Sequence, residues 1–316
     1  MKMINIKGFD KPISSLIQGS DYFRPDIYET VRSVLDRFIA IGGNTIDTAF
    51  GYMRGESEVA IGMWLEERNN RKDVIILTKG AHPFPHIPRR VNRECITADL
   101  TESLKRLKTD YIDLYALHRD DPDVPVSTII DVLNEHIDAG RIKAIGVSNW
   151  TTERIQEAND YAAMNGKIGF TFNSPNLSLA KAQEPYFPGS ISANAEYCSW
   201  HEKTQLPLLS WSSQARGFFT GRFTPEDLSN KDLVRAFYTD ANWERYHRAE
   251  QLAEEKGVST IKIALAYVLN QPFPTCAVIG PQNEEELLSC YEGSKIILTH
   301  EEVEWLEYGE SINANI

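Results

Sequence analysis

Residues 74–80, VIILTKG, form a short apolar run that ends in Lys79 and a glycine. Two similar stretches lie on either side of it in the chain: residues 46–52 are IDTAFGY and residues 112–118 are IDLYALH. Longer amphipathic stretches separate these runs, an alternation that is typical of βα units and a parallel sheet. Because parallel strands end at the same face of a sheet, we expect the polar residues that end these runs to meet there.

The same alternation continues along the chain and predicts its architecture. We expect eight strands, at residues 14–18, 44–47, 74–78, 111–117, 142–147, 168–172, 207–210 and 277–279. Helical patterns lie near residues 27–41, 56–70, 92–108, 126–139, 151–165, 190–203, 242–257 and 283–291, and residues 258–270 indicate a further helix. Strands that alternate with helices in this number predict an α/β fold, a (β/α)8 TIM barrel, with residues 1–316 as a single domain.

The main alternative is a doubly wound sheet. However, no GxGxxG motif follows the first predicted strand, and no P-loop pattern is present. Long insertions at residues 80–91 and 211–243 follow the third and the seventh predicted strand. Long loops in compact domains are usually functional, and barrels carry their sites at the carboxyl ends of their strands. We therefore expect the site at that face, with long loops around it.

Composition excludes several classes of function. A chain that is 42% hydrophobic and 25% charged is typical of a globular protein rather than a disordered one. The net charge of −12 disfavours nucleic acid and anionic membranes as partners. We see neither a signal peptide pattern nor an apolar run of roughly 18 residues that could cross a membrane. The cysteines show no metal-ligand spacing, and we expect reduced thiols in a cytoplasmic protein; they are Cys95, Cys198, Cys276 and Cys290.

Four residues near the predicted strand ends form a proton-transfer set: Asp47, Tyr52, Lys79 and His118. A tyrosine has a pKa of about 10 and is a poor acid at neutral pH, but an adjacent ammonium lowers that pKa. We expect Asp47 to hold Lys79 in place and His118 to orient a carbonyl oxygen. Such a set can protonate that oxygen while a hydride reaches its carbon, and the hydride must come from a cofactor. Taken singly, each residue also has a structural explanation, such as helix capping or packing.

At this point the chain resembles the aldo-keto reductase family. The matching stretches are residues 42–62 (GGNTIDTAFGYMRGESEVAIG), 74–80, 113–122 (DLYALHRDDP), 140–150 (GRIKAIGVSNW), 208–223 (LLSWSSQARGFFTGRF) and 264–287 (ALAYVLNQPFPTCAVIGPQNEEEL). The family has a (β/α)8 barrel, binds a nicotinamide cofactor without a Rossmann motif, and reduces carbonyls to alcohols. The resemblance implies that Tyr52 is the general acid/base, assisted by Lys79, Asp47 and His118.

The resemblance also implies a set of cofactor contacts. Gly19 and Ser20 would lie beside the nicotinamide ribose, and Trp211 would stack on the nicotinamide. Ser148 and Asn149 would bind the carboxamide. Asp47 would also border the cofactor, and the remaining implied contacts, to the pyrophosphate and adenosine, are Ser212, Ser213, Gln214, Ala215, Gly217, Phe218, Arg222, Gly280, Gln282 and Glu286.

Three positions depart from the family pattern. Ser174 stands where many relatives have glutamine, so the carboxamide contact could be altered. Glu286 lies where the family often binds an adenosine phosphate; a carboxylate repels phosphate but can accept a hydrogen bond from a free ribose hydroxyl. The resemblance therefore implies NADP(H) by family default, while Gln282 and Glu286 leave NAD(H) open, unless Glu286 simply faces water. Arg216 is unusual and could reach either the substrate or the phosphates.

We expect a small-molecule carbonyl substrate in a pocket lined by the 80–91 loop and by Tyr22, Phe23, Tyr52, Met53, His118 and Arg119. Aromatic walls suit carbonyl compounds or the faces of sugars. Polar residues 119–121 (RDD) favour a sugar-like substrate, although this run could also be a solvated loop. Two alternatives remain open: a cofactor-binding regulatory or redox-sensing subunit with little turnover, and an enzyme that works mainly as an alcohol or sugar dehydrogenase. The sequence does not indicate an oligomeric state.

Overall fold

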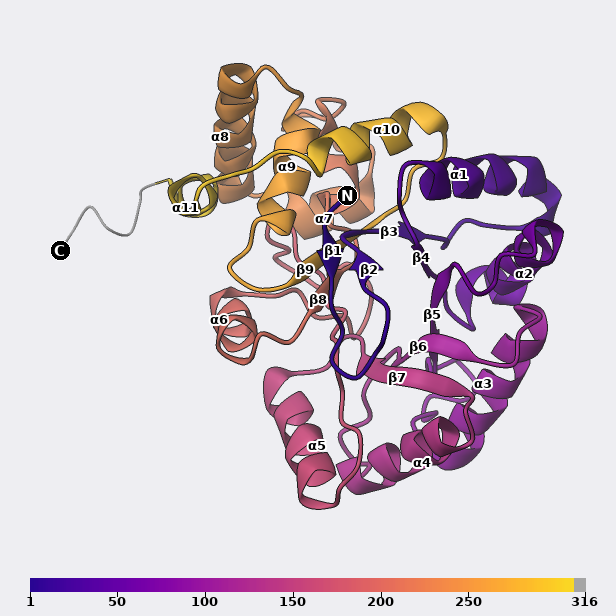
Figure 1. The fold of residues 1–316 in the computed structure, drawn as a ribbon. Coiled ribbons are helices and arrows are strands. Elements are labelled where there is room, and N and C mark those ends of the chain that lie inside the picture. Colours follow the sequence, from indigo (N-terminus) through magenta and orange to yellow (C-terminus); the bar gives the residue numbers. More distant parts are fainter. Residues whose placement is uncertain (310–316) are drawn as a thin grey trace.

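The computed structural model describes residues 1–309, and its central feature is a curled sheet of parallel strands (Figure 1). Within these residues the sheet has seven strands in the order β7-β6-β5-β4-β3-β9-β8. The strands are β3 (Leu16–Gly19), β4 (Thr45–Asp47), β5 (Ile75–Gly80), β6 (Ile112–Leu117), β7 (Ile142–Val147), β8 (Leu208–Ser210) and β9 (Thr275–Ile279). The predicted α/β class with a parallel sheet is therefore confirmed.

Helices lie around the outside of this sheet (Figure 1). They are α1 (Tyr28–Ala40), α2 (Glu56–Arg68), α3 (Arg93–Arg106), α4 (Val126–Asp138), α5 (Thr152–Met164), α6 (Ala195–Thr204), α7 (Lys231–Phe237), α8 (Asp240–Lys256), α9 (Thr260–Leu269), α10 (Glu284–Gly293) and α11 (His300–Tyr308). Short 3₁₀ turns are η1 (Pro25–Ile27), η2 (Tyr52–Gly55) and η3 (Ala215–Thr220). Several helices begin at a side-chain cap, such as Asn92 before α3 and Asn283 before α10, a contact that stabilises a helix by about 1 kcal/mol.

The predicted strand at residues 168–172 is not formed as a regular strand. Its backbone N–H groups at Ile168 and Phe170 donate to the side chains of Asn134 and Asn159, at 2.9 and 2.6 Å, instead of to a neighbouring strand. The next residues, up to Asn173, lie between the two edges of the sheet. Asn173 makes isolated bridges to Val147 on β7 and to Leu208 on β8. The N–H groups of Thr171 and Ser174 also donate to Ile145 and Val147 of β7, at 2.9 and 2.8 Å, so a few backbone contacts stand in place of a regular eighth strand.

A small antiparallel hairpin, β1 (Met3–Ile4) and β2 (Ile13–Ser14), leads directly into β3 and was not expected from the sequence. Its buried side chains Ile4 and Ile13 pack in one cluster with sheet residues that include Ile17, Leu77 and Leu114. In Figure 1 the hairpin crosses the middle of the curled sheet. Because β2 precedes the start of β3, the hairpin covers the amino-terminal end of the sheet interior and leaves the carboxyl end for the site.

Two further elements differ from expectation. The segment at residues 211–243 is not a plain loop, because it contains η3 and α7. The helix expected at 190–203 begins only at Ala195, and α11 was not predicted. The segment at residues 80–91 is irregular apart from one bridge between Phe84 and Ile87. In the part of the chain that the structure describes, no helix has the length and apolarity needed to span a membrane.

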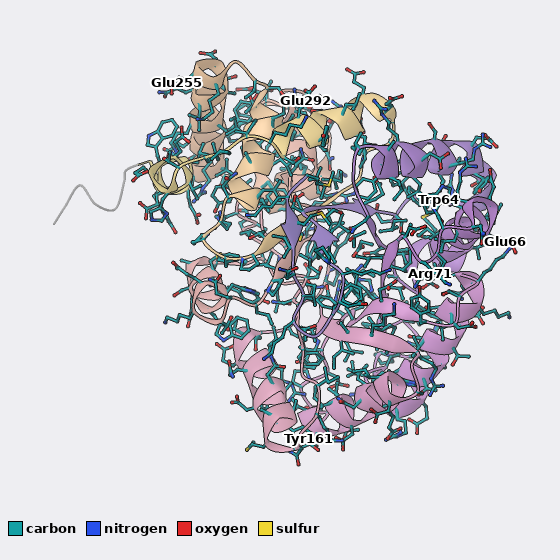
Figure 2. The ribbon with its side chains drawn as sticks, in the orientation of Figure 1. Trp64, Glu66, Arg71, Tyr161, Glu255 and Glu292 are labelled. Atoms are coloured by element: carbon teal, nitrogen blue, oxygen red, sulfur yellow. The ribbon has the colours of Figure 1, made fainter. Side chains whose placement is uncertain are left out.

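Side chains divide between an apolar interior and a charged outer face (Figure 2). Trp64 of α2 is 1% exposed, and its indole N–H donates to Asp36 of α1 at 2.9 Å. Glu66, Glu255 and Glu292 lie on the outer faces of α2, α8 and α10. On this exterior Glu292 pairs with Lys262 at 2.6 Å and Glu66 pairs with Lys108.

Candidate active site

The structure brings the four predicted catalytic side chains together. Asp47 is the last residue of β4, Lys79 lies next to the end of β5, and His118 directly follows β6. These strands pair in the order β4-β5-β6, so their ends are neighbours. Tyr52 begins η2 in the loop after β4. Ser20, just after β3, donates its hydroxyl to the Asp47 carbonyl oxygen at 2.8 Å and ties the next strand end to this group.

Lys79 is the centre of the cluster. Its Nζ donates to Asp47 at 2.6 Å, to the Thr48 carbonyl oxygen at 2.9 Å and to the Tyr52 hydroxyl at 3.3 Å. These contacts use all three N–H groups of the ammonium, as a buried cation requires. Burial alone lowers the pKa of Lys79, but Asp47 and Tyr52 raise it more, so its net pKa lies above the ordinary value. Lys79 therefore stays charged beside the phenol.

Tyr52 holds its proton at neutral pH. Burial raises its pKa to about 12, although the Lys79 ammonium acts in the opposite direction and Asp47 adds to the rise. The expected lowering by Lys79 is thus outweighed by the loss of hydration around the phenolate. A protonated phenol can donate a proton, and the ammonium at 3.3 Å would stabilise the phenolate that remains.

His118 lies beside Tyr52, with its ring centroid 5.6 Å from that of the phenol ring. Burial lowers its pKa well below the ordinary value, and the positive charges of Lys79 and Arg119 lower it further. The imidazole is therefore neutral at physiological pH. Its Nδ1 is buried and has no hydrogen-bond partner within residues 1–309. A neutral ring with unused hydrogen-bonding capacity can orient or polarise a carbonyl oxygen.

His82 is a site residue that sequence reasoning did not single out. Its ring centroid lies 4.8 Å from that of His118, and the two rings are inclined by 70°. The signal was its position three residues after Lys79, at the start of the 80–91 loop. Buried Asp99 anchors this loop, because it accepts a hydrogen bond from the Ala81 N–H at 2.8 Å and pairs with Arg90.

The ends of β8, β9 and β3 form an open strip beside this cluster. Gln18 of β3 pairs with Ile279 of β9, so Gly19 and Gly280 are adjacent. A side chain at Gly19 would meet the Ile279 carbonyl oxygen at 2.9 Å, whereas one at Gly280 would meet nothing within 4 Å. Trp211 follows β8, which pairs with β9. The strip is therefore open at Gly280, packed backbone against backbone at Gly19, and bordered by the half-buried ring of Trp211.

The end of β7 carries a connected polar group. Ser148 donates to the Ser174 carbonyl oxygen at 2.7 Å, and Asn149 Nδ2 donates to Ser148 Oγ at 2.9 Å. Asn149 Oδ1 accepts a hydrogen bond from the Ile191 N–H at 3.0 Å, and Ser174 donates to the Leu209 carbonyl oxygen at 2.8 Å. These predicted carboxamide contacts are thus held in fixed orientations by one another.

The segment after Trp211 turns sharply through left-handed backbone conformations. Positive φ angles occur at Ser212, Ala215, Arg216 and Gly217. Turns of this kind can present successive N–H groups to an anion, which suits a pyrophosphate. Ala215 and Phe218 are fully buried, and Phe218 packs on Trp243 with ring centroids 4.7 Å apart. Their side chains therefore belong to the core, and only their backbone can contact a cofactor.

Two neighbouring residues of this segment, Ser213 and Gln214, make polar contacts with β9 and α9. The Ser213 hydroxyl donates to the Val278 carbonyl oxygen at 3.1 Å, and Gln214 Nε2 donates to the Ile261 carbonyl oxygen at 3.4 Å. Arg216 pairs with Asp21 at 3.6 Å, which links this segment to the loop after β3. These contacts connect η3 with β9, α9 and the β3 end.

Glu286 does not simply face water. Its Oε2 accepts a hydrogen bond from the Gln282 N–H at 2.9 Å, and its own N–H donates to Asn283 Oδ1 at 2.9 Å. Its other oxygen lies 3.9 Å from Nη2 of Arg222, which is largely exposed. The carboxylate therefore occupies the amino-terminal end of α10, a position that favours negative charge.

The predicted substrate residues do not all reach the site. Phe23 is 0% exposed and packs edge-on against Tyr22, so its side chain belongs to the core and does not line the pocket. The Tyr22 hydroxyl donates to the Pro281 carbonyl oxygen, which places its ring near the open strip. Met53 adopts a φ of 48° in η2 and is half-buried. Arg119 is half-buried beside His118, and its Nη1 donates to the His118 carbonyl oxygen at 2.8 Å.

Comparisons with known proteins agree with this architecture. The model of the aldo/keto reductase family matches residues 20–308. The aldo-keto reductase YhdN of Bacillus subtilis is 32% identical over 82% of this chain and 76% of its own length. An NADP(+) aryl-alcohol dehydrogenase of Phanerodontia chrysosporium is 27% identical over 86% of this chain and 74% of its own length. Norsolorinic acid reductase B of Aspergillus parasiticus is 27% identical, with coverages of 88% and 74%.

A solved structure shows the same fold. The thermostable aldo-keto reductase Tm1743, in complex with the inhibitor epalrestat, superimposes with a TM-score of 0.75 at 22% identity, covering 97% of this chain and 99% of that chain. With the match of the family model, this chain belongs to the aldo/keto reductase family. Membership makes it an oxidoreductase, of a family that generally uses NADP(H).

Proposed function

We propose that this protein is an NAD(P)H-dependent reductase that converts aldehydes or ketones to alcohols, with Tyr52 as the general acid. One observation carries the proposal. The protonated Tyr52 hydroxyl lies 3.3 Å from the buried Lys79 ammonium, which Asp47 holds at 2.6 Å. A binding module has no need for a buried cation held against a phenol, so this arrangement favours turnover over a purely regulatory role.

The residues at the strand ends fit a nicotinamide cofactor. Gly280 leaves open space at the end of β9, and Trp211 offers a flat aromatic face after the neighbouring strand β8. The left-handed turns after Trp211 suit the pyrophosphate. The strip adjoins the end of β4, because β3 pairs with β4. When bound there, the reduced cofactor would supply the hydride that no side chain can provide.

The chain's own residues would supply the proton and stabilise the charge that its transfer leaves behind. Tyr52 gives its proton to the carbonyl oxygen as negative charge develops on it, and His118 donates a hydrogen bond to the same oxygen. Lys79 stabilises the resulting phenolate, and Asp47 keeps Lys79 charged and in place. General acid catalysis of this kind typically contributes about 10²–10⁴-fold in rate. The reverse reaction would use the same residues, with Tyr52 as the base.

Glu286 supports NADH as a usable cofactor besides the family's NADPH. Its carboxylate already accepts the Gln282 N–H and faces Arg222, the two groups best placed to hold a phosphate at this end of the strip. A phosphate there would meet a negative charge, whereas a free ribose hydroxyl could donate to it. We therefore propose that the enzyme accepts both cofactors.

The eight-stranded barrel expected from the sequence also forms part of this proposal. The bridges from Asn173 to Val147 and Leu208 support closure of the sheet between β7 and β8. Closure at that point would bring Ser148 and Trp211 to one continuous rim. The site residues would then surround the substrate from all sides.

The test is a titration followed by a turnover assay. Binding of NADPH and NADH is measured by protein fluorescence, and oxidation of each is then followed by absorbance with a panel of aromatic, aliphatic and sugar aldehydes and ketones. We expect binding of at least one cofactor and turnover of several carbonyls. Tight binding with no turnover across the whole panel would instead identify a cofactor-sensing protein.

A further inference from the structure

Arg119 is a charged residue of the site that the mechanism does not use. It directly follows His118 and is half-buried. Its Nη1 donates to the His118 carbonyl oxygen at 2.8 Å, which occupies one of its five N–H groups. Across residues 1–309, no carboxylate lies within ion-pair distance of its guanidinium. Two buried cations near the site do have such a partner: Lys79 pairs with Asp47, and Arg90 pairs with Asp99.

The acidic residues next to Arg119 in the sequence are already engaged. Asp120 pairs with Arg154 of α5, whose Nε lies 3.3 Å from Asp120 Oδ2. Asp121 lies 4.0 Å from Arg89. The run at residues 119–121 is therefore not a group of free polar side chains for reading sugar hydroxyls. The two aspartates of this run pair with other arginines, and Arg119 alone of the three remains without an ion-pair partner in the described part of the chain.

The charge of Arg119 acts on the titratable side chains of the candidate site. Its charge favours the phenolate of Tyr52 and disfavours the protonated forms of His118 and His82, so it acts on all three of these side chains. Its stem passes over Gly189, where an added side chain would lie 3.7 Å from Nε. The guanidinium is partly buried, and this burial lowers the pKa of Arg119.

The half-buried guanidinium of Arg119 lacks, among the described residues, a carboxylate that would compensate for its lost hydration. Partial burial removes water from a charge and is unfavourable unless another partner replaces that water. The planar fork of arginine matches carboxylate and phosphate groups. The surrounding cations and imidazoles provide no negative charge to Arg119, while the net charge of −12 would repel anions from most other surfaces.

We propose that Arg119 binds an anionic group, a carboxylate or a phosphate, on the carbonyl substrate. This inference rests on the proposed reductase function and narrows its substrate class to carbonyl compounds that carry a negative charge. The anion would bind beside Tyr52 and His118, so the carbonyl is the part of the same molecule that reaches them. Arg119 is then a specificity-determining residue that also positions the reacting oxygen.

The test uses aldehydes that differ in charge but little in shape. The probes are 4-carboxybenzaldehyde, its neutral amide 4-formylbenzamide, and 4-formylphenyl phosphate. For wild type we expect kcat/KM to be about 10- to 100-fold higher for an anionic probe than for the amide, mainly through KM. In Arg119→Met this ratio should fall to near one, and Arg119→Lys should retain part of it. The control Arg93→Met removes a surface cation of α3 and should leave the ratio unchanged.

The outcomes separate the two proposals. Failure of every probe and of every other carbonyl would refute the reductase function itself. Turnover of the amide as fast as the anionic probes, or an anion preference that survives in Arg119→Met, would refute the role of Arg119 while leaving the function intact. A merely structural Arg119 would reduce turnover of all probes equally. If Arg119→Met does not fold, competitive inhibition of wild type by terephthalate, but not by terephthalamide, keeps the proposal testable. Preference for the phosphate or the carboxylate decides between the two anions.

Discussion

The Nζ atom of Lys79 lies 3.3 Å from the hydroxyl oxygen of Tyr52, although the two residues belong to different elements, β5 and η2. The ammonium is held in this position by two further hydrogen bonds, to Asp47 and to the Thr48 carbonyl oxygen. Removal of any of these partners changes the proton affinity of the phenol. This relationship is the basis of the first prediction.

Tyr52→Phe should reduce kcat by about 10²–10⁴-fold and leave cofactor affinity nearly unchanged, because it removes only the proton donor. The measurement is steady-state reduction of an aromatic aldehyde together with a fluorescence titration of NADPH. Tyr161→Phe is the matched control, since that hydroxyl donates to Asp131 on the outer surface at 3.0 Å (Figure 2). Equal losses in the two variants would contradict the role of Tyr52.

Trp211→Ala should weaken cofactor binding by roughly 10-fold or more, because it removes the aromatic face next to the open strip. Trp211→Phe should lose less, since a smaller ring still stacks. Dissociation constants from calorimetry provide the comparison. If Trp211→Ala binds both cofactors as tightly as wild type does, the nicotinamide does not stack on this residue.

Glu286→Gln should shift the cofactor preference toward NADPH by about 5- to 10-fold, because it removes a negative charge but keeps an oxygen for the Gln282 N–H. The measurement is the ratio of kcat/KM values for NADPH and NADH. Glu285→Gln, an exposed change in the same helical turn, is the control for the general charge of α10. An unchanged ratio in Glu286→Gln would show that its carboxylate lies away from the adenosine.

His201→Gln should flatten the acid dependence of stability. Burial lowers the pKa of His201 to about 4, and its neutral ring donates to the Leu206 carbonyl oxygen at 2.7 Å and accepts from Asn173 at 3.1 Å. The unfolded chain, with a pKa of about 6.5, binds a proton first as the pH falls. Stability contributed by this group is therefore lost between about pH 6.5 and about pH 4, by roughly 3 kcal/mol.

Urea unfolding at about pH 7 and about pH 4.5 tests this effect. The free energy of unfolding of wild type should fall more between these pH values than that of His201→Gln, by about 2–3 kcal/mol. The other carboxylates and histidines titrate in both proteins, so they cancel in the difference. Parallel pH profiles would show that folding does not lower the pKa of His201.

Much of the fold and part of the candidate site could be predicted from the sequence alone. Runs such as 74–80 predicted seven of the strands that residues 1–309 contain, because a strand buried on both faces needs a continuous apolar run. The position of Asp47, Lys79 and His118 at strand ends was sufficient to predict that they meet, since parallel strands end at one face. These features depend on local pattern and on one topological rule.

Other features depend on contacts between distant residues. The strand expected at 168–172 is not regular because Asn134 of α4 and Asn159 of α5 accept the N–H groups of Ile168 and Phe170. The raised pKa of Tyr52 depends on burial, which removes water from the phenol. Arg119 has no carboxylate partner within residues 1–309 because the neighbouring Asp120 pairs with Arg154 instead. Burial and charge pairing are properties of the assembled fold. The sequence therefore predicted which groups gather at the candidate site, whereas the tertiary structure determined their protonation and the charges around them.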